Sequence, residues 1–215
     1  AYRLLMDEPF FAALSRKIEK RADSNIPTAG VRVCPDTAQF EMIYNPEFFA
    51  SMPEAHVRGV LKHEFYHLIF EHVTSRKPEG VDHKTWNIAA DLAINSHLVG
   101  ELPDMACMPG VAPFEDLPLG QTAEWYLAHM PKNDESAGGE GGEGDEGDEP
   151  GSFDDHSGWD DDSNSPAQQA ANQMAKERLR QAMKEAAQEA SKSPQGWGSM
   201  SGEVKQEILK RLETK

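Results

Sequence analysis

The sequence has only two cysteines, Cys34 and Cys107, among its 215 residues. Two cysteines cannot build the disulfide framework of a small secreted domain, so they favour a reducing compartment. Long hydrophobic runs are also absent, because no apolar stretch approaches the roughly 18 residues that a membrane-spanning helix needs. The first residues lack the basic and then apolar pattern of a signal peptide. We therefore expect a cytoplasmic protein that has no membrane partner.

Basic residues are missing from one long segment. Between Asp134 and Asp162 there are 13 acidic residues and no Lys or Arg, and the whole chain has a net charge of −16. The rest of the chain is therefore nearly neutral. It has no basic patch of the kind that contacts nucleic-acid phosphates, so we expect no nucleic-acid partner. Residues 133–166 are rich in Gly, Asp, Glu and Ser, which is typical of a disordered acidic linker.

Residues 153–159 form an aromatic island in this linker, with Phe153, His156 and Trp159. A disordered spacer does not need aromatic side chains, so we expect a short docking element. Two interpretations stay open. The island either folds back on the rest of the chain, with His156 or Asp155 near the metal-binding motif described next and inhibiting it, or anchors the C-terminal helices by packing.

The main chemical motif is His63-Glu64-Phe65-Tyr66-His67, an H-E-x-x-H string. Two histidines four residues apart lie about 40° apart around a helix axis, so both imidazoles can reach one tetrahedral zinc. Glu64 is then placed to act as general base toward an activated water. Chance alone gives such a string in roughly one chain in fifty of this histidine content, so its surroundings decide.

The surroundings of the motif predict a buried helix over about 53–75. Ser51 and Glu54 have the spacing of a capping box, with Pro53 in the first turn. Apolar residues then cover most of the helix surface, which predicts burial on several sides. A glutamate between two histidines is costly to bury there, and a divalent metal is the obvious partner.

A third protein ligand is expected on the next helix, which starts at Asp82 and runs to about Val99. Asn87, Asp91 and Asn95 are spaced four residues apart and form a polar stripe on an apolar helix. We expect Asp91 to bind the metal and the two amides to orient the ligands.

His72 is the competing third ligand. On a continuous helix it lies about 180° from His63, so it would reach the metal only if the helix broke between them. No glycine occurs between His63 and His72, and we therefore favour Asp91.

The remaining pattern predicts a mainly helical α+β fold with a small sheet. The late helices have too few bulky apolar residues to form a core alone, so they pack on the N-terminal domain, on a partner, or on something missing. The strand at 39–44 is either an ordinary strand or a platform for an extended peptide. The expected elements are helix 1–22, strands 31–34 and 39–44, a short helix after Asn45, an irregular segment 101–120, helix 122–130, and helices 166–191 and 201–213.

Three stretches together resemble a known family. They are Asn45-Pro46-Glu47-Phe48-Phe49, the H-E-x-x-H helix, and Trp86 to Asp91 followed by Asn95. Over about residues 8–130 the chain is similar to the metallopeptidase domain found N-terminal to von Willebrand A-like domains in bacterial and phage proteins. The resemblance implies a zincin-like α+β domain with His63, His67 and Asp91 on zinc and Glu64 as base.

The resemblance also implies a layout that this chain does not complete. Such proteins continue into the von Willebrand A-like domain, whereas this chain stops at Lys215. We expect either that this domain was removed or that the chain is a short natural form. The expected organisation is a metallopeptidase domain at 1–132, the acidic linker at 133–166 and a C-terminal helical segment at 167–215.

Two functions follow as hypotheses. The first is a zinc metallopeptidase that acts on a peptide or protein substrate, with Glu64 as general base. The alternative is a zinc-stabilised, non-catalytic interaction module that partners a von Willebrand A-like domain. The group that would stabilise a transition state is left open by the spacing, with His83, His97, His129 and Tyr126 as candidates.

Overall fold

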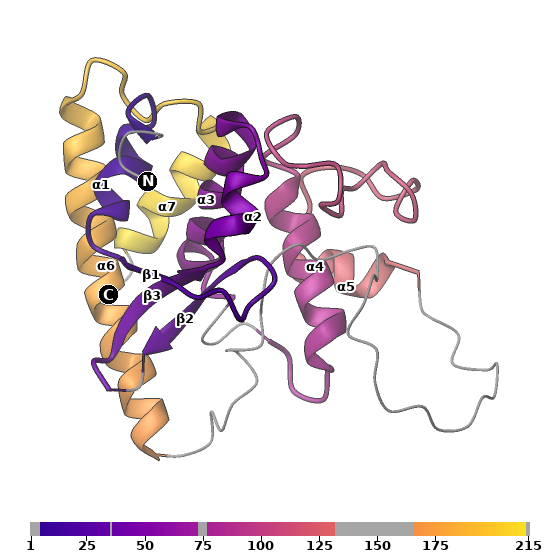
Figure 1. Ribbon diagram of the computed structural model, residues 1–215, viewed down its shortest axis with the longest axis horizontal. Coiled ribbons are helices and arrows are strands. Elements are labelled where there is room, and N and C mark those ends of the chain that lie inside the picture. Colours follow the sequence, from indigo (N-terminus) through magenta and orange to yellow (C-terminus); the bar gives the residue numbers. More distant parts are fainter. Residues whose placement is uncertain (1–4, 35, 73–76, 132–165, 214–215) are drawn as a thin grey trace.

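The computed structural model describes residues 5–34, 36–72, 77–131 and 166–213, and this part is an α+β structure with seven helices and a small three-stranded sheet (Figure 1). The acidic segment 133–165 and the island at 153–159 lie outside the described residues. The elements are α1 (Pro9–Ser15), β1 (Glu19–Ala22), β2 (Ala29–Cys34), β3 (Gln39–Tyr44), α2 (Pro46–Ala50), α3 (Glu54–Ile69), α4 (His83–Asn95), α5 (Ala123–His129), α6 (Pro166–Lys192) and α7 (Gly202–Glu213).

The sheet has the strand order β1-β3-β2. β2 and β3 form the predicted antiparallel pair, in which Cys34 lies opposite Gln39. β1 pairs with the other side of β3 in parallel. Of the two interpretations of residues 39–44, the structure favours the ordinary strand, because β3 is central, with β2 along one edge and β1 paired with Glu41–Tyr44 on the other.

The predicted helix over 1–22 is also wrong in its second half. The helix α1 ends at Ser15, and the chain continues as strand β1 from Glu19. Lys20 and Arg21 of this segment lie on the edge strand β1, and Arg21, like Arg32 of β2, approaches the carboxylate of Glu41. Pairing with β3 decides this segment, because tertiary contacts outweigh a weak local preference for helix.

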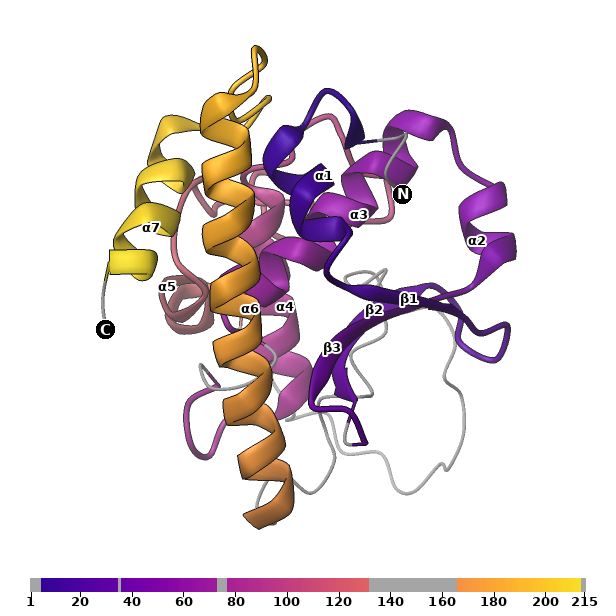
Figure 2. The same ribbon diagram turned by 90° about the vertical axis from the view of Figure 1, so that its left-hand side faces the viewer.

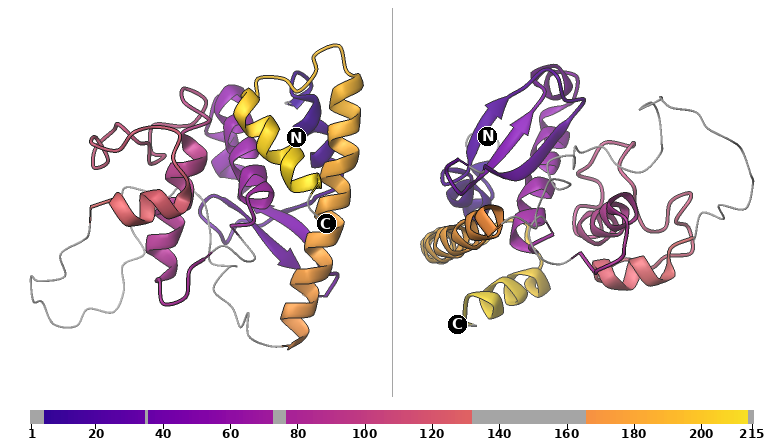
Figure 3. Two further views of the ribbon diagram at one scale, coloured as in Figure 1. Left: turned by 180° about the vertical axis from the view of Figure 1, so that it is seen from behind. Right: turned by 90° about the horizontal axis from the view of Figure 1, so that it is seen from below.

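The helix α3 lies between the sheet and α4 and carries the H-E-x-x-H string (Figure 3). It begins at Glu54 with Pro53 as N-cap and no side-chain cap. The predicted capping box is wrong because Ser51 ends the preceding helix, where its hydroxyl donates to the Phe48 carbonyl at 2.7 Å. The predicted cap of α2 is confirmed, since the Asn45 side chain accepts from the Glu47 amide at 2.9 Å.

The helices expected to start at Asp82 and Thr122 are present as α4 and α5, and both residues act as N-caps. Asp82 accepts from the Thr85 amide at 2.8 Å, and Thr122 accepts from the Trp125 amide at 3.2 Å. The helix α4 ends at Asn95 rather than near Val99. None of the described helices is long and apolar enough to cross a membrane.

The C-terminal helices pack on the N-terminal elements. The long helix α6 lies along α1 and one side of the sheet, and it shares their core (Figure 2). Trp197, in the turn after α6, stacks on Phe10 with ring centroids 4.9 Å apart. Of the three alternatives for these helices, packing on the N-terminal domain is the one observed. A second, smaller core lies between α4, α5 and the irregular segment before α5.

A buried charged cluster joins both ends of the chain to α3. Lys62 is 1% exposed, and its ammonium lies 3.2 Å from Glu8, 2.7 Å from Glu101 and 2.9 Å from the Ser199 hydroxyl. The Ser199 amide donates to the other Glu8 oxygen at 2.9 Å. Gly198 has a φ of 71°, and a Cβ there would lie 2.2 Å from Glu8. The turn between α6 and α7 is therefore built to close over Lys62.

Candidate metal centre

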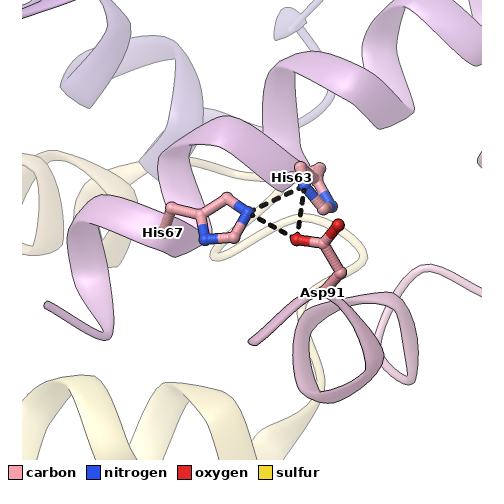
Figure 4. Close-up of side chains that lie close together, drawn as sticks. All are labelled: His63, His67 and Asp91. Atoms are coloured by element: carbon pink, nitrogen blue, oxygen red, sulfur yellow. Dashed lines mark hydrogen bonds and ion pairs between the residues drawn. The ribbon is translucent and has the colours of Figure 1, made fainter. Parts of the chain in front are cut away.

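Three side chains from two facing helices converge inside the protein (Figure 4). His63 and His67 come from α3 and Asp91 from α4, and all three are 0% exposed. The two Nε2 atoms lie 2.8 Å apart. Oδ1 of Asp91 lies 3.2 Å from Nε2 of His67 and 3.7 Å from Nε2 of His63. The three ligands predicted from sequence are thus brought together.

The spacing of these atoms fits a metal ion. A tetrahedral zinc with bonds of about 2.0–2.1 Å separates its ligand atoms by roughly 3.3 Å, which is close to the edges of this triangle. Two imidazole nitrogens and one carboxylate oxygen are also a ligand set used by zinc. Within the residues that the structure describes, His63, His67 and Asp91 form the one group of His, Cys, Asp or Glu able to hold a metal ion.

Asn95 fixes the tautomer of His63. Its Nδ2 donates to the Cys107 carbonyl at 2.7 Å, and a carbonyl can only accept. The amide oxygen of Asn95 therefore faces Nδ1 of His63, at 2.7 Å. Nδ1 of His63 carries the proton, and the lone pair of its Nε2 points toward the centre. The predicted orienting role of the amide stripe is met by Asn95.

Asn87, the other amide of the stripe, behaves differently. Its Oδ1 is buried and has no hydrogen-bond partner among the described residues. Asn87 is only partly buried, whereas Asn95 is fully buried. The four-residue spacing correctly placed both on one helix face, but only the amide nearer the irregular segment meets a carbonyl that can orient it.

His72 is buried and contacts His67, rather than pointing away from the two histidines across the helix. The premise of a continuous helix to about 75 is wrong, because α3 ends at Ile69 and the chain turns back at Glu71, which has a φ of 60°. Nδ1 of His72 lies 3.3 Å from Nδ1 of His67. This is the ring nitrogen opposite Nε2, so His72 contacts a candidate ligand without joining the group of three.

Glu64 follows His63 on α3 and is 0% exposed. On an ideal helix its side chain leaves the axis about 60° from that of His67. Glu64 is therefore on the same half of the helix as both histidines. Its role as general base stays a prediction.

The candidates for transition-state stabilisation differ in their surroundings. The Tyr126 hydroxyl already donates to the Pro118 carbonyl at 2.6 Å and lies 2.9 Å from the Ser96 hydroxyl. His129 is exposed and stacks on Trp125. Burial lowers the pKa of His97, while the charge of Glu203 acts in the opposite direction. These surroundings do not single out Tyr126, His97 or His129 for the role.

The comparisons with known proteins agree with this picture. A protein of Thermotoga maritima, described as uncharacterized, is 32% identical over 62 residues, which make up 29% of this chain and 16% of that protein. The matched part thus spans about a sixth of that relative. No solved structure matches the chain. A family described as "Putative metallopeptidase domain" matches residues 1–213. Because this match covers nearly the whole chain, the protein belongs to that metallopeptidase domain family.

Proposed function

We propose that the protein is a zinc-dependent peptidase of the H-E-x-x-H type with a zincin-like arrangement. The observation that carries the proposal is the buried triangle of His63, His67 and Asp91 in a chain of a metallopeptidase family. Three protein ligands are the number typical of catalytic zinc, which keeps a fourth position for water or substrate, whereas structural zinc has four.

Each residue of the centre has a distinct task in this proposal. Zinc, when bound, polarises the scissile carbonyl and makes water a better nucleophile. Asn95 holds His63 in the tautomer that offers Nε2 as a ligand. Glu64 takes the proton of the attacking water and delivers it to the leaving amine. Two facing helices supply all three ligands, so little reorganisation is needed when the metal binds.

A second candidate function is a zinc-stabilised, non-catalytic interaction module, with a von Willebrand A-like domain as its proposed partner. The observation that favours it is the complete burial of His63, Glu64, His67 and Asp91, because a peptide must reach a catalytic metal. One feature favours access: a cavity of about 270 Å³ is lined by His72 and by residues of α4 and α7. This cavity therefore reaches His72, which contacts the candidate ligand His67.

Metal analysis followed by digestion of a mixed peptide library separates the two candidates. The peptidase should contain one zinc per chain and cleave the library. Glu64→Gln should keep the zinc but lose about 10²–10⁴-fold in cleavage rate, the usual contribution of a general base. Glu54→Gln, a change in the exposed first turn of the same helix, is the matched control and should cleave normally. Zinc without Glu64-dependent cleavage would favour the interaction module, and absence of zinc would contradict both candidates.

A further inference from the structure

We propose that His72 is a positioning residue that holds His67 in the tautomer and ring orientation needed to bind metal. The inference rests on the proposed metal site, and it gives His67 the counterpart of the contact that Asn95 makes with His63. Its basis is the 3.3 Å separation between the Nδ1 atoms of His67 and His72, together with the backbone geometry that brings His72 back to the helix.

The proton positions follow from the chemistry of coordination. If Nε2 of His67 binds the metal, its lone pair is used there and the ring proton must be on Nδ1. That N–H is inside the protein and needs an acceptor. The atom facing it is Nδ1 of His72, which accepts only when the His72 ring is neutral and carries its own proton on Nε2. Metal-binding histidines usually donate to a carboxylate or carbonyl, and here an imidazole takes that place.

The backbone around His72 is that of a Schellman helix end. The Glu71 amide donates to the Leu68 carbonyl at 3.1 Å, and the His72 amide donates to the His67 carbonyl at 3.0 Å. His72 is therefore tied to His67 through its backbone as well as its ring. The two contacts define one position for the His72 side chain.

Glu71 occupies the left-handed position of this helix end, where glycine is the usual residue. A side chain there costs about 1–2 kcal/mol. A strained backbone next to a functional site is a reason to look for a residue whose placement depends on it. In this chain that residue is His72.

The plane of the His72 ring is fixed by two further aromatic rings. Trp86, a buried residue of α4, packs edge-on against it with ring centroids 5.8 Å apart and an interplanar angle of 85°. Phe70 lies 6.0 Å away on the chain's own turn. His72 is 3% exposed, so it has little freedom to swing away from His67. The helix α4 thus provides Asp91 as a candidate ligand. Through Trp86, it also holds His72 against His67, a second candidate ligand.

A core histidine with no role at the metal would give the same burial. Variants that move or remove the acceptor separate the two cases. His72→Asn places an amide oxygen near the position of Nδ1. His72→Gln is chemically similar but places its amide near the position of Nε2. His72→Phe keeps a ring against Trp86 and removes the acceptor. His56→Phe, in the first turn of α3, is the control for replacing a histidine with phenylalanine away from His67.

The measurement is the zinc dissociation constant of each purified full-length variant, obtained by competition with a chromogenic chelator. We expect His72→Phe to bind zinc about 10–100-fold more weakly, His72→Asn to recover most of that affinity, and His72→Gln to recover little. His56→Phe should bind like the unaltered protein. Thermal unfolding of the metal-free variants shows whether stability follows the same order. Visible spectra of the cobalt-substituted proteins report any change in ligand geometry.

Each outcome bears on the proposal. Equal zinc affinity in His72→Phe and the unaltered protein would overturn it and leave the metal site intact. Equal affinities of His72→Asn and His72→Gln, with stability and affinity falling together, would reduce His72 to a packing residue. If the unaltered protein bound no zinc, the proposed function and this inference would both fail. The comparison of Asn with Gln stays decisive if His72→Phe folds poorly, because both variants carry the same amide group and place it at different ring-nitrogen positions.

Discussion

The amide oxygen of Asn95 lies 2.7 Å from Nδ1 of His63, and its nitrogen lies 2.7 Å from the Cys107 carbonyl. This arrangement links a metal-ligand candidate on α3 to the irregular segment that follows α4. Because the carbonyl accepts only from the amide nitrogen, the segment controls which way the amide faces. The orientation of His63 therefore depends on residues in three separate parts of the chain.

Replacing Asn95 with Ala should weaken zinc binding about 10–100-fold, because His63 loses the acceptor that fixes its tautomer. Chelator competition measures the affinity. Asn87→Ala is the matched control, since Asn87 is on the same face of α4 but its oxygen has no described partner. A loss of the same size in both variants would mean that the helix face as a whole matters rather than the bond to His63.

Replacing Glu71 with Gly should relieve the left-handed backbone at the end of α3. Glu71→Ala removes the same carboxylate and keeps the Cβ, so the difference between the two variants isolates the backbone effect. We expect Glu71→Gly to be more stable than Glu71→Ala by about 1 kcal/mol in urea unfolding. Equal stabilities would show that the φ of 60° carries no strain.

Replacing Lys62 with Met should destabilise the protein by about 3 kcal/mol, because Glu8 and Glu101 lose the cation that compensates their burial. Urea unfolding measures the effect. Lys17→Met is the matched control, since Lys17 forms an ion pair of 2.9 Å with Glu185 in which both side chains are about half exposed. Exposed pairs contribute little, so the control should unfold at the same urea concentration as the unaltered protein. An effect in Lys17→Met as large as that in Lys62→Met would contradict this account of burial.

Stability should fall as the pH drops below about 6.5 in part because of His97. Burial lowers the pKa of His97 from its ordinary value of 6.5, so the unfolded chain takes up a proton before the folded protein does. His97→Gln should therefore lose less stability than the unaltered protein between about pH 7 and pH 5. Thermal unfolding across that range tests this, and parallel profiles would exclude His97 as a source of the acid sensitivity.

Glu203 provides a control of opposite sign. Its charge raises the pKa of His97 and partly opposes the effect of burial. Glu203→Gln should therefore make the loss of stability at low pH steeper, whereas His97→Gln makes it shallower. In a variant with both changes, Glu203→Gln should no longer make the loss of stability at low pH steeper, because His97 is absent.

The features that the sequence predicted well are those set by neighbouring residues. Three helices begin where they were expected, at Asn45, Asp82 and Thr122, because an N-cap is a bond across two or three residues. The four-residue spacing of His63 and His67 is also local, and so is the polar stripe on α4 that identified Asp91 as the third candidate ligand. Periodicity also identified β2 and β3 as strands.

The features that the sequence did not predict depend on distant residues or unusual backbone. The strand β1 exists because Glu19 to Ala22 pair with β3, about twenty residues away. The end of α3 was placed too late because Glu71 adopts a conformation usually marked by glycine. β3 is central because β1 pairs with it. His72 contacts His67 because the chain turns back at Glu71. Both features were therefore missed as well.

The closure of Glu8 and Ser199 over Lys62 joins residues 191 positions apart in the sequence. A ribosome adds roughly 5–20 residues per second, so Glu8 is made about 10–40 seconds before its partner. During that interval Lys62 lacks its contact with Ser199. Contacts between residues so distant in sequence also slow folding. The enclosure of Lys62, which precedes His63 on α3, is therefore complete only after Ser199 has been synthesised.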